Sequence, residues 1–233
     1  SAQALHFAAL SNDVDADSLP TALPYINGEH YFDQPIMGGE LSLNWSAYAI
    51  SRDDSSIPFS EASHGTMQSR ATADLRWKSR LISDGGVLLT PFANLRSDFY
   101  VTDNLADPLA PGGERSQETT ARILPAAGFD VRFPLISGHD YGQSIVSPVF
   151  QFIASDNEKN ADNISNEDAI TLNFDQSSLF LEDRFTGYDR FESGVRTNLG
   201  LTYTFLGSNG GFVKASAGES FHVAGKNSFV AGS

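Results

Sequence analysis

The stretch RATADLRWKSRLI, residues 70–82, decides the fold class because its side chains alternate between two faces. Alternation with a period of two is typical of a β-strand that has one apolar and one polar surface. One face carries Ala71, Ala73, Leu75, Trp77 and Leu81, and the other carries Arg70, Thr72, Asp74, Arg76, Lys78 and Arg80. The glycines of Ser83-Asp84-Gly85-Gly86 supply the positive φ of a tight hairpin. The stretch therefore predicts a long strand followed by a short turn.

The same period recurs along most of the chain. Alternating runs occupy residues 41–51, 86–101, 121–135, 193–205 and 212–225. We predict an all-β, antiparallel up-and-down meander of about eight long strands. Strands of soluble proteins usually span about 5–6 residues, whereas a transmembrane β-strand needs about 9–11 residues with apolar side chains toward lipid. The runs therefore favour part of a large outer-membrane β-barrel, and the alternative is a soluble or surface-exposed β-sandwich binding module.

The lengths of the connections support the barrel. Residues 83–86 and 207–211 form short turns, whereas residues 53–63, 103–116 and 156–178 form long, polar, acidic loops. Short turns on one side and long loops on the other are typical of outer-membrane barrels. Helical periodicity is weak and confined to the region of residues 13–19.

Composition excludes several classes of protein. The net charge is −14 and no Lys/Arg cluster occurs, which argues against a nucleic-acid partner. No apolar run reaches the roughly 18 residues of a transmembrane helix, so a helical membrane protein is excluded. The absence of cysteine rules out disulfides, Cys-based zinc sites and thiol nucleophiles in this sequence.

The residues with catalytic or metal-binding chemistry form no known motif. The histidines lack zinc-site spacing: His6, His30, His64, His139 and His222. Ser220 and His222 share one face of a strand, and an outer-membrane hydrolase built on them is a distant alternative. The acidic segment 155–168 could hold calcium, although a solvated loop is favoured; its carboxylates are Asp156, Glu158, Asp162, Glu167 and Asp168. We therefore expect no catalytic, cofactor or metal site and no enzymatic activity.

Several sequence blocks resemble one family, in the order in which that family has them. They are TARILPAAGFDVRFPL, SIVSPVFQFIASDN, ISNEDAITLNFDQSSLF, RFTGYDRFESGVRTNLGLTYTF and GGFVKASAGESFHVAGKNSF. These blocks resemble the lipopolysaccharide-assembly outer-membrane protein family (LptD, the organic solvent tolerance protein family), closest to its alphaproteobacterial members. The resemblance is strongest over residues 116–229, and FDQPIMGGELSLNWSAYAISR fits it more loosely. It implies that residues 1–233 are an internal fragment of the transmembrane β-barrel domain.

The resemblance also implies function, partners and location. Family members insert lipopolysaccharide into the outer leaflet of the Gram-negative outer membrane, without enzymatic chemistry. A lumen-plugging, LptE-like lipoprotein is implied as one partner. A periplasmic, LptA-like jelly-roll bridge is implied as another, through an N-terminal part that this sequence does not show. No cofactor is implied, and the disulfides of other members have no cysteines here.

The basic residues of the polar faces are the candidate contacts for the lipid. They either bind the phosphorylated sugars of lipopolysaccharide, since arginine binds phosphate bidentately, or form wall ion pairs with Asp74, Asp98, Asp130 and Asp189. The residues are Arg70, Arg76, Lys78, Arg96, Arg122, Arg132, Arg190 and Arg196. The ion pairs are the favoured interpretation.

Two further features concern the strands themselves. Three prolines interrupt strand patterns, Pro91, Pro125 and Pro148. Proline removes a ladder donor, so we expect bulges at these positions, with locally weakened pairing as the alternative. A family signature precedes the strand expected from Val195 to Phe205, and consists of Arg184, Phe185, Gly187, Tyr188, Asp189, Arg190 and Gly194. We expect Asp189 to pair with the neighbouring arginines and Tyr188 to lie near the interfacial aromatic girdle.

Overall fold

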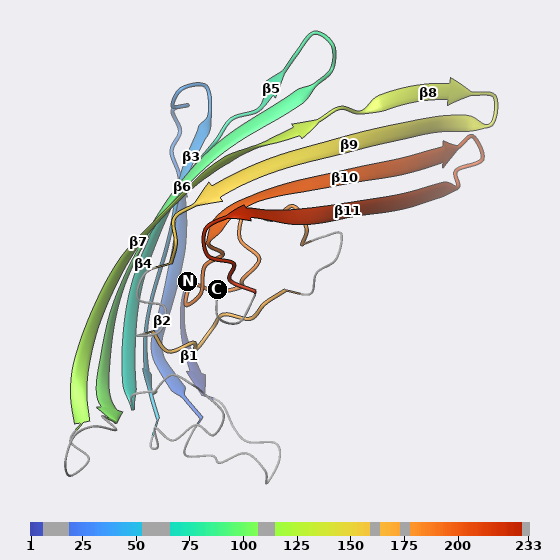
Figure 1. The fold of residues 1–233 in the computed structure, drawn as a ribbon. Coiled ribbons are helices and arrows are strands. Elements are labelled where there is room, and N and C mark those ends of the chain that lie inside the picture. The colour runs from blue at the N-terminus through green and yellow to red at the C-terminus, as the bar shows by residue number, and fades with distance from the viewer. Residues whose placement is uncertain (7–18, 53–65, 107–114, 159–163, 173–177, 230–233) are drawn as a thin grey trace.

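A computed structural model describes residues 1–6, 19–52, 66–106, 115–158, 164–172 and 178–229. Within these ranges the chain forms one antiparallel sheet of eleven strands, which curves around an inner side (Figure 1). The strands are β1 (Ala2–His6), β2 (Thr21–Tyr31), β3 (Glu40–Ser51), β4 (Met67–Lys78), β5 (Leu81–Ile82), β6 (Leu88–Ala106), β7 (Arg115–Arg132), β8 (Leu135–His139), β9 (Gly142–Ser155), β10 (Gly194–Gly207) and β11 (Phe212–Ala224).

The order of the strands is that of an up-and-down meander. The path is β1-β2-β3-β4-β6-β7-β9-β10-β11, with β5 paired to β6 and β8 paired to β9. Eight of the described strands have 11 to 19 residues, which confirms the prediction of about eight long strands. The alternative β-sandwich is wrong, because the described strands lie in one sheet rather than in two facing sheets. The weak helical signal falls mainly on residues outside the described ranges.

The buried face of the sheet is polar. In β4 the burial alternates strictly from Met67 to Asp74, and the four covered side chains are all polar: Gln68, Arg70, Thr72 and Asp74. The same face continues in β6 with Arg96 and Asp98 and in β7 with Arg122, all at most 4% exposed. Among the described residues, 24 polar side chains are buried but only 12 apolar ones. This ratio is the reverse of a soluble core, which buries mainly apolar side chains.

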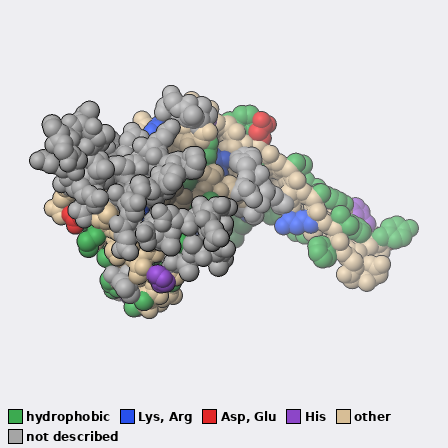
Figure 2. All heavy atoms as spheres, turned by 90° about the horizontal axis from the view of Figure 1, so that it is seen from below, with side chains coloured by type: hydrophobic (Ala, Val, Ile, Leu, Met, Phe, Trp, Pro, Cys, Tyr) green, Lys and Arg blue, Asp and Glu red, His purple; other side chains and the backbone are tan. Residues whose placement is uncertain are grey.

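The opposite face of the sheet is apolar and exposed. Phe99 of β6, Ile123 of β7 and Leu201 of β10 are 49%, 65% and 49% exposed. Figure 2 shows hydrophobic side chains along the projecting arm that β8–β11 form. Apolar side chains directed outward and polar ones directed inward are the arrangement of a membrane-spanning β-barrel wall. The described residues contain no helix with the length and hydropathy that a helical membrane crossing requires.

The three strand prolines lie in continuous ladders. Pro91 pairs with Phe129, Pro125 with Leu95 and Pro148 with Leu201, with no shift of register at any of them. The prediction of bulges is therefore wrong.

Each proline instead lies where the neighbouring strand is interrupted. The carbonyl oxygens of Pro91, Pro125 and Pro148 accept hydrogen bonds from the N–H groups of Ser79, Asp156 and Phe133, at 3.1–3.2 Å. Ser79 lies between β4 and β5, Phe133 lies between β7 and β8, and Asp156 follows the end of β9. The N and C=O of one residue in an antiparallel strand face the same neighbouring strand. A proline opposite an interruption of that strand therefore loses one hydrogen bond where the ladder is already broken, and the register is unchanged.

A charge on the outer face should destabilise the fold more than one on the inner face. Leu95 and Thr90 both belong to β6, but Leu95 is 45% exposed on the apolar face and Thr90 lines an inner cavity with basic and acidic residues. We expect Leu95→Lys to lower the free energy of unfolding in lipid vesicles by up to about 2–4 kcal/mol. Thr90→Lys is the control and should change it by less than about 1 kcal/mol. Equal losses from the two variants would contradict the assignment of the faces.

Candidate functional site: a plug bound to the inner face

The connection between β9 and β10 folds back onto the polar face of the sheet. We call residues 156–193 the plug, of which residues 156–158, 164–172 and 178–193 are described. In Figure 1 the plug lies on the inner side of the curved sheet, and not beyond its rim. Hydrogen bonds from Arg70 of β4, Arg96 of β6 and Arg122 of β7 hold it there. A loop that was expected to be solvated is therefore part of the interior.

Two aspartates connect two parts of the plug through hydrogen bonds to its backbone. The Asp189 carboxylate accepts hydrogen bonds from the backbone N–H groups of Glu167 (2.8 Å) and Asp168 (3.0 Å). The Asp168 carboxylate accepts in return from the N–H groups of Tyr188 (3.0 Å) and Asp189 (3.1 Å). Burial favours the neutral form of Asp168, but Arg70 and the Tyr188 N–H outweigh it, so the pKa of Asp168 lies below its ordinary value. We call this reciprocal pair the aspartate clasp.

The backbone of Gly187 makes the aspartate clasp possible. Gly187 has φ +64°, in the left-handed region that side chains disfavour. A Cβ at this position would lie 2.4 Å from the Asp168 carboxylate. Glycine therefore permits both the turn and the close approach of the carboxylate to the following N–H groups.

Arg70 joins the aspartate clasp to the sheet. Its Nη1 lies 2.7 Å from the Asp189 Oδ1 and 2.8 Å from the Asp168 Oδ2. The side chains of Arg70 and Asp189 are fully buried, and Tyr100 Oη donates a further bond to Asp189 Oδ1 at 3.1 Å. The guanidinium also lies over the ring of Tyr48, at 4.3 Å from its centroid. A buried charge needs this density of partners to offset the loss of water.

Two further arginines bind the plug through its carbonyl oxygens. Arg96 donates to the Tyr188 carbonyl at 2.8 Å, and Arg122 donates to the Asp189 carbonyl at 3.1 Å. Asp98 lies between the two arginines, 3.2 Å from Arg96 Nε and 2.7 Å from Arg122 Nε. The two wall arginines share the Asp98 carboxylate, and their remaining donors reach the plug.

The position of Tyr188 corrects one expectation. The ring lies on the inner side, 5.2 Å from the Arg70 guanidinium and 5.6 Å from that of Arg96. It therefore belongs to the plug and not to an interfacial girdle. The Asp189 carboxylate pairs with Arg70, which is 119 residues away, whereas the neighbouring Arg190 donates to the Asp189 carbonyl oxygen at 3.2 Å. Tyr100 was missed entirely, although its even position in β6 places it on the polar face.

The acidic segment is also bound to the wall. Glu158 pairs with Arg122, and Glu167 Oε2 lies 2.5 Å from Arg52 Nη2. Burial raises the pKa of Glu158, against the opposing effect of Arg122. Asp162 lies outside the described residues. No cluster of three potential metal ligands occurs among the described residues, and the expectation of a solvated loop is wrong for its described part.

The other basic candidates lie lower on the inner face or in the plug. Arg76 pairs with Asp74 at 2.6 Å, Arg132 with Asp130 at 2.8 Å and Lys78 with Glu182 at 3.6 Å. The side chains of these three basic residues remain about half exposed, at 50–52%. Arg190, in the plug, donates to the Ile164 carbonyl at 3.0 Å.

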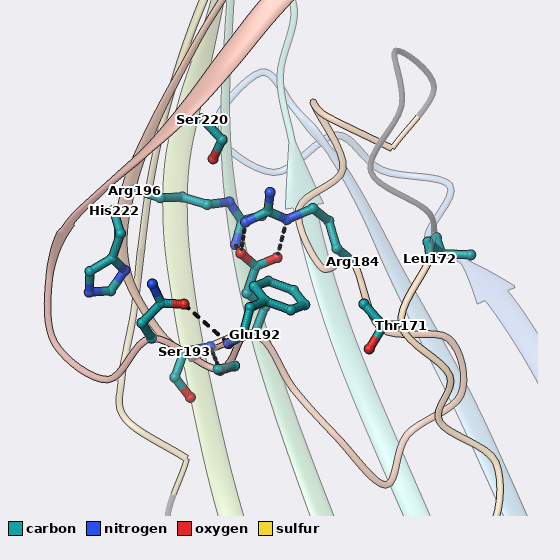
Figure 3. A pocket seen from close by; sticks show the side chains of 11 residues that line it. Thr171, Leu172, Arg184, Glu192, Ser193, Arg196, Ser220 and His222 are labelled. Atoms are coloured by element: carbon teal, nitrogen blue, oxygen red, sulfur yellow. Dashed lines mark hydrogen bonds and ion pairs between the residues drawn. The ribbon is translucent and has the colours of Figure 1, made fainter. Parts of the chain in front are cut away.

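A second charged cluster lies where the plug meets β10. Glu192 binds Arg184 through both carboxylate oxygens and lies 2.8 Å from Arg196 Nη1 (Figure 3). Gly194 follows with φ +90° and starts β10, as predicted for the signature. Ser220 and His222 line the same cavity, but His222 Nε2 lies 3.0 Å from the Gly225 carbonyl. This geometry therefore does not support the hydrolase alternative.

The fold and the plug define a class of protein. A single curved sheet that is apolar outside and polar inside, with a loop folded inward, has the arrangement of a segment of an outer-membrane-type β-barrel. A comparison with protein families matches residues 1–233 to LptD, LPS transport system D. Because the match covers the whole sequence, the chain belongs to the LptD family, a family of lipopolysaccharide transport, as the sequence blocks predicted. No individual curated protein matches the chain.

Removal of one charge from the aspartate clasp should release the plug. We expect Asp189→Asn to weaken plug attachment by about 3–5 kcal/mol, because Arg70 loses the partner that lies deepest in the protein. Limited trypsin digestion of the protein in detergent should then cut after Arg190 at least about tenfold faster. Asp130→Asn is the matched control, since its partner Arg132 is half exposed. Unchanged protection of Arg190 in Asp189→Asn would contradict the role of the clasp.

Proposed function

We propose that residues 1–233 are a segment of the wall of the transmembrane barrel of an outer-membrane lipopolysaccharide translocon in a Gram-negative bacterium. The barrel delivers lipopolysaccharide to the outer leaflet, and its work is transport and assembly without enzymatic chemistry. Membership of the LptD family supports the substrate. The inversion of polar and apolar faces supports the position of the segment in a membrane.

The observation that carries the proposal is a row of half-exposed cations, each beside a carboxylate, where the inner face meets the plug; we call this row the basic track. Two adjoining cavities of about 310 Å³ each lie there and share Lys78, Phe180 and Glu182. Arg76 lines one cavity and Arg132 lines the other, and Lys78 stands between them. Half-exposed cations can exchange a carboxylate partner for a phosphate, whereas the fully buried Arg70 and Arg122 are committed to the plug.

The division between buried and half-exposed cations assigns two roles to the inner face. Arg70, Arg96 and Arg122 hold the plug in place. Arg76, Lys78 and Arg132 offer charge to the phosphorylated sugars that pass. Aromatic side chains such as Phe92 and Phe180 also line these cavities and give acyl chains or sugar rings an apolar surface.

The partners follow from the family. A lumen-plugging, LptE-like lipoprotein would contact the inner face that the plug leaves uncovered. A periplasmic, LptA-like jelly-roll bridge would supply lipopolysaccharide through an N-terminal part of the protein. The strong negative charge of the chain argues against nucleic acid as a partner.

Site-specific photo-crosslinking in cells tests the basic track. A photoreactive amino acid at Lys78 or Arg132 should capture newly made lipopolysaccharide in a pulse and lose it in a chase, because the lipid only passes these positions. The matched control is Leu199 on the outer face, which is 45% exposed. Any adduct there should not decline during the chase. The absence of transient adducts at both Lys78 and Arg132 would contradict the proposed route.

Membrane extraction tests the location. The protein should require detergent for extraction from the outer-membrane fraction. It should also migrate faster on gels when unheated than when heated, because a closed barrel resists unfolding by detergent. Recovery in the aqueous fraction without detergent would exclude the barrel.

A further inference from the structure

A separate cavity of about 370 Å³ lies between the plug, β10 and β11 (Figure 3). Arg184 and Glu192 come from the plug, Arg196 from β10, and Ser220 and His222 from β11. These residues are not those of the basic track. The described part of the cavity thus brings two arginines, one carboxylate and several neutral polar side chains to one place.

The two arginines of this cavity share one carboxylate, that of Glu192. Arg184 takes both oxygens of Glu192, with its Nε 2.8 Å from Oε2 and its Nη2 on Oε1. Arg196 must share Oε1, and its Nη1 lies 2.8 Å away without the alignment of a hydrogen bond. Within the described lining, one carboxylate is therefore shared by two guanidinium groups, while Asp183 and Glu182 act on Arg196 from outside the cavity.

Arg196 also carries an unused donor. The residue is 3% exposed, and its Nη2 donates to the carbonyls of Leu181 and Glu182 at 2.6 and 2.8 Å. Its Nε is buried and has no hydrogen-bond partner among the residues that the structure describes. A buried charged donor without a partner costs about 1–3 kcal/mol or more, so such groups generally mark a bound water, ion or ligand.

We propose that this cavity binds one phosphate group, with Arg196 and Arg184 as its cationic contacts and the Ser220 hydroxyl as a neutral donor. In Figure 3 the Ser220 hydroxyl points toward the arginine pair. Phosphate has enough acceptor oxygens to serve two arginines and a hydroxyl at once, which a carboxylate does less well. Glu192 occupies the arginines when the ligand is absent.

The surroundings also fit a phosphate that is attached to a larger group. Phe229 lines the cavity, and the Arg184 guanidinium lies 4.9 Å from the centroid of its ring. The volume exceeds that of a single phosphate and leaves room for a sugar. Lipopolysaccharide as the source of the phosphate rests on the proposed function, whereas the phosphate site itself does not.

Titration of inorganic phosphate into the detergent-solubilised protein by calorimetry tests the site. We expect Arg196→Gln to weaken binding at least about tenfold, because a charge-assisted hydrogen bond is lost. Glu192→Gln should strengthen binding about tenfold, because the competing carboxylate is neutralised. Lys214→Gln, an exposed charge change on β11 outside the cavity, should leave the affinity unchanged. Heat-modifiable mobility confirms that each variant is folded.

A binding site predicts that Arg196→Gln weakens phosphate binding and that Glu192→Gln strengthens it. A purely structural ion pair does not predict these opposite changes in affinity. No binding of phosphate to the wild type, or equal affinity in wild type and Glu192→Gln, would overturn the proposal even if Arg196→Gln fails to fold. The titration contains no lipid, so its failure would leave cross-linking at the basic track untouched. A failure of that cross-linking would likewise leave phosphate binding intact.

Competition identifies the source of the phosphate. If micelles of lipopolysaccharide displace inorganic phosphate and micelles of enzymatically dephosphorylated lipopolysaccharide do not, the lipid headgroup is the ligand. If neither displaces it, the site takes a free phosphate compound. If both displace it equally, the displacement does not depend on phosphate and the proposal is wrong.

Discussion

The buried ion pair between Arg70 and Asp189 is the interaction on which the rest of the structure depends. A sheet with an apolar outer face must direct its polar side chains inward, and those charges lose water wherever anything covers them. Asp189 neutralises Arg70 while its second oxygen binds the backbone of residues 167–168. The same pair therefore offsets the free-energy cost of burying the Arg70 charge. It also fixes the conformation of the plug, which covers Arg70.

The sheet remains regular around this pair because its three strand prolines lie opposite interruptions of the neighbouring strands. Pro91 and Pro148 face the breaks between β4 and β5 and between β7 and β8, and Pro125 faces the point where the chain leaves β9 for the plug. The ladder loses donors only where the neighbouring strand is already interrupted, so the register that places Arg70 opposite Tyr100 and Asp98 opposite Arg122 is preserved. The plug contacts thus depend on register as much as on charge.

The basic side chains of the inner face fall into groups that differ in their solvent exposure. The fully buried arginines are committed to carboxylates and carbonyls of the plug, whereas Arg76, Lys78 and Arg132 keep about half of their surface in the open. The cluster of Arg184, Glu192 and Arg196 is different again, because it is buried and its two arginines share the Glu192 carboxylate. The exposed fraction of each side chain therefore distinguishes the cations that hold the plug from those that are accessible to a phosphorylated lipid.

The strands, the two faces and the family could be predicted from the sequence alone, because an alternation of period two and the order of several blocks are local properties that need no knowledge of contacts. Residues 184–194 also stood out as distinctive. Their contacts depend on the fold, since the partner of Asp189 lies 119 residues away and across the sheet. Side-chain period specifies which face a residue occupies, but not whether that face meets solvent or a folded loop. For this reason the acidic segment was expected to be solvated, Tyr188 was placed at an interface, and the roles of Tyr100 and Glu192 could not be read from the sequence.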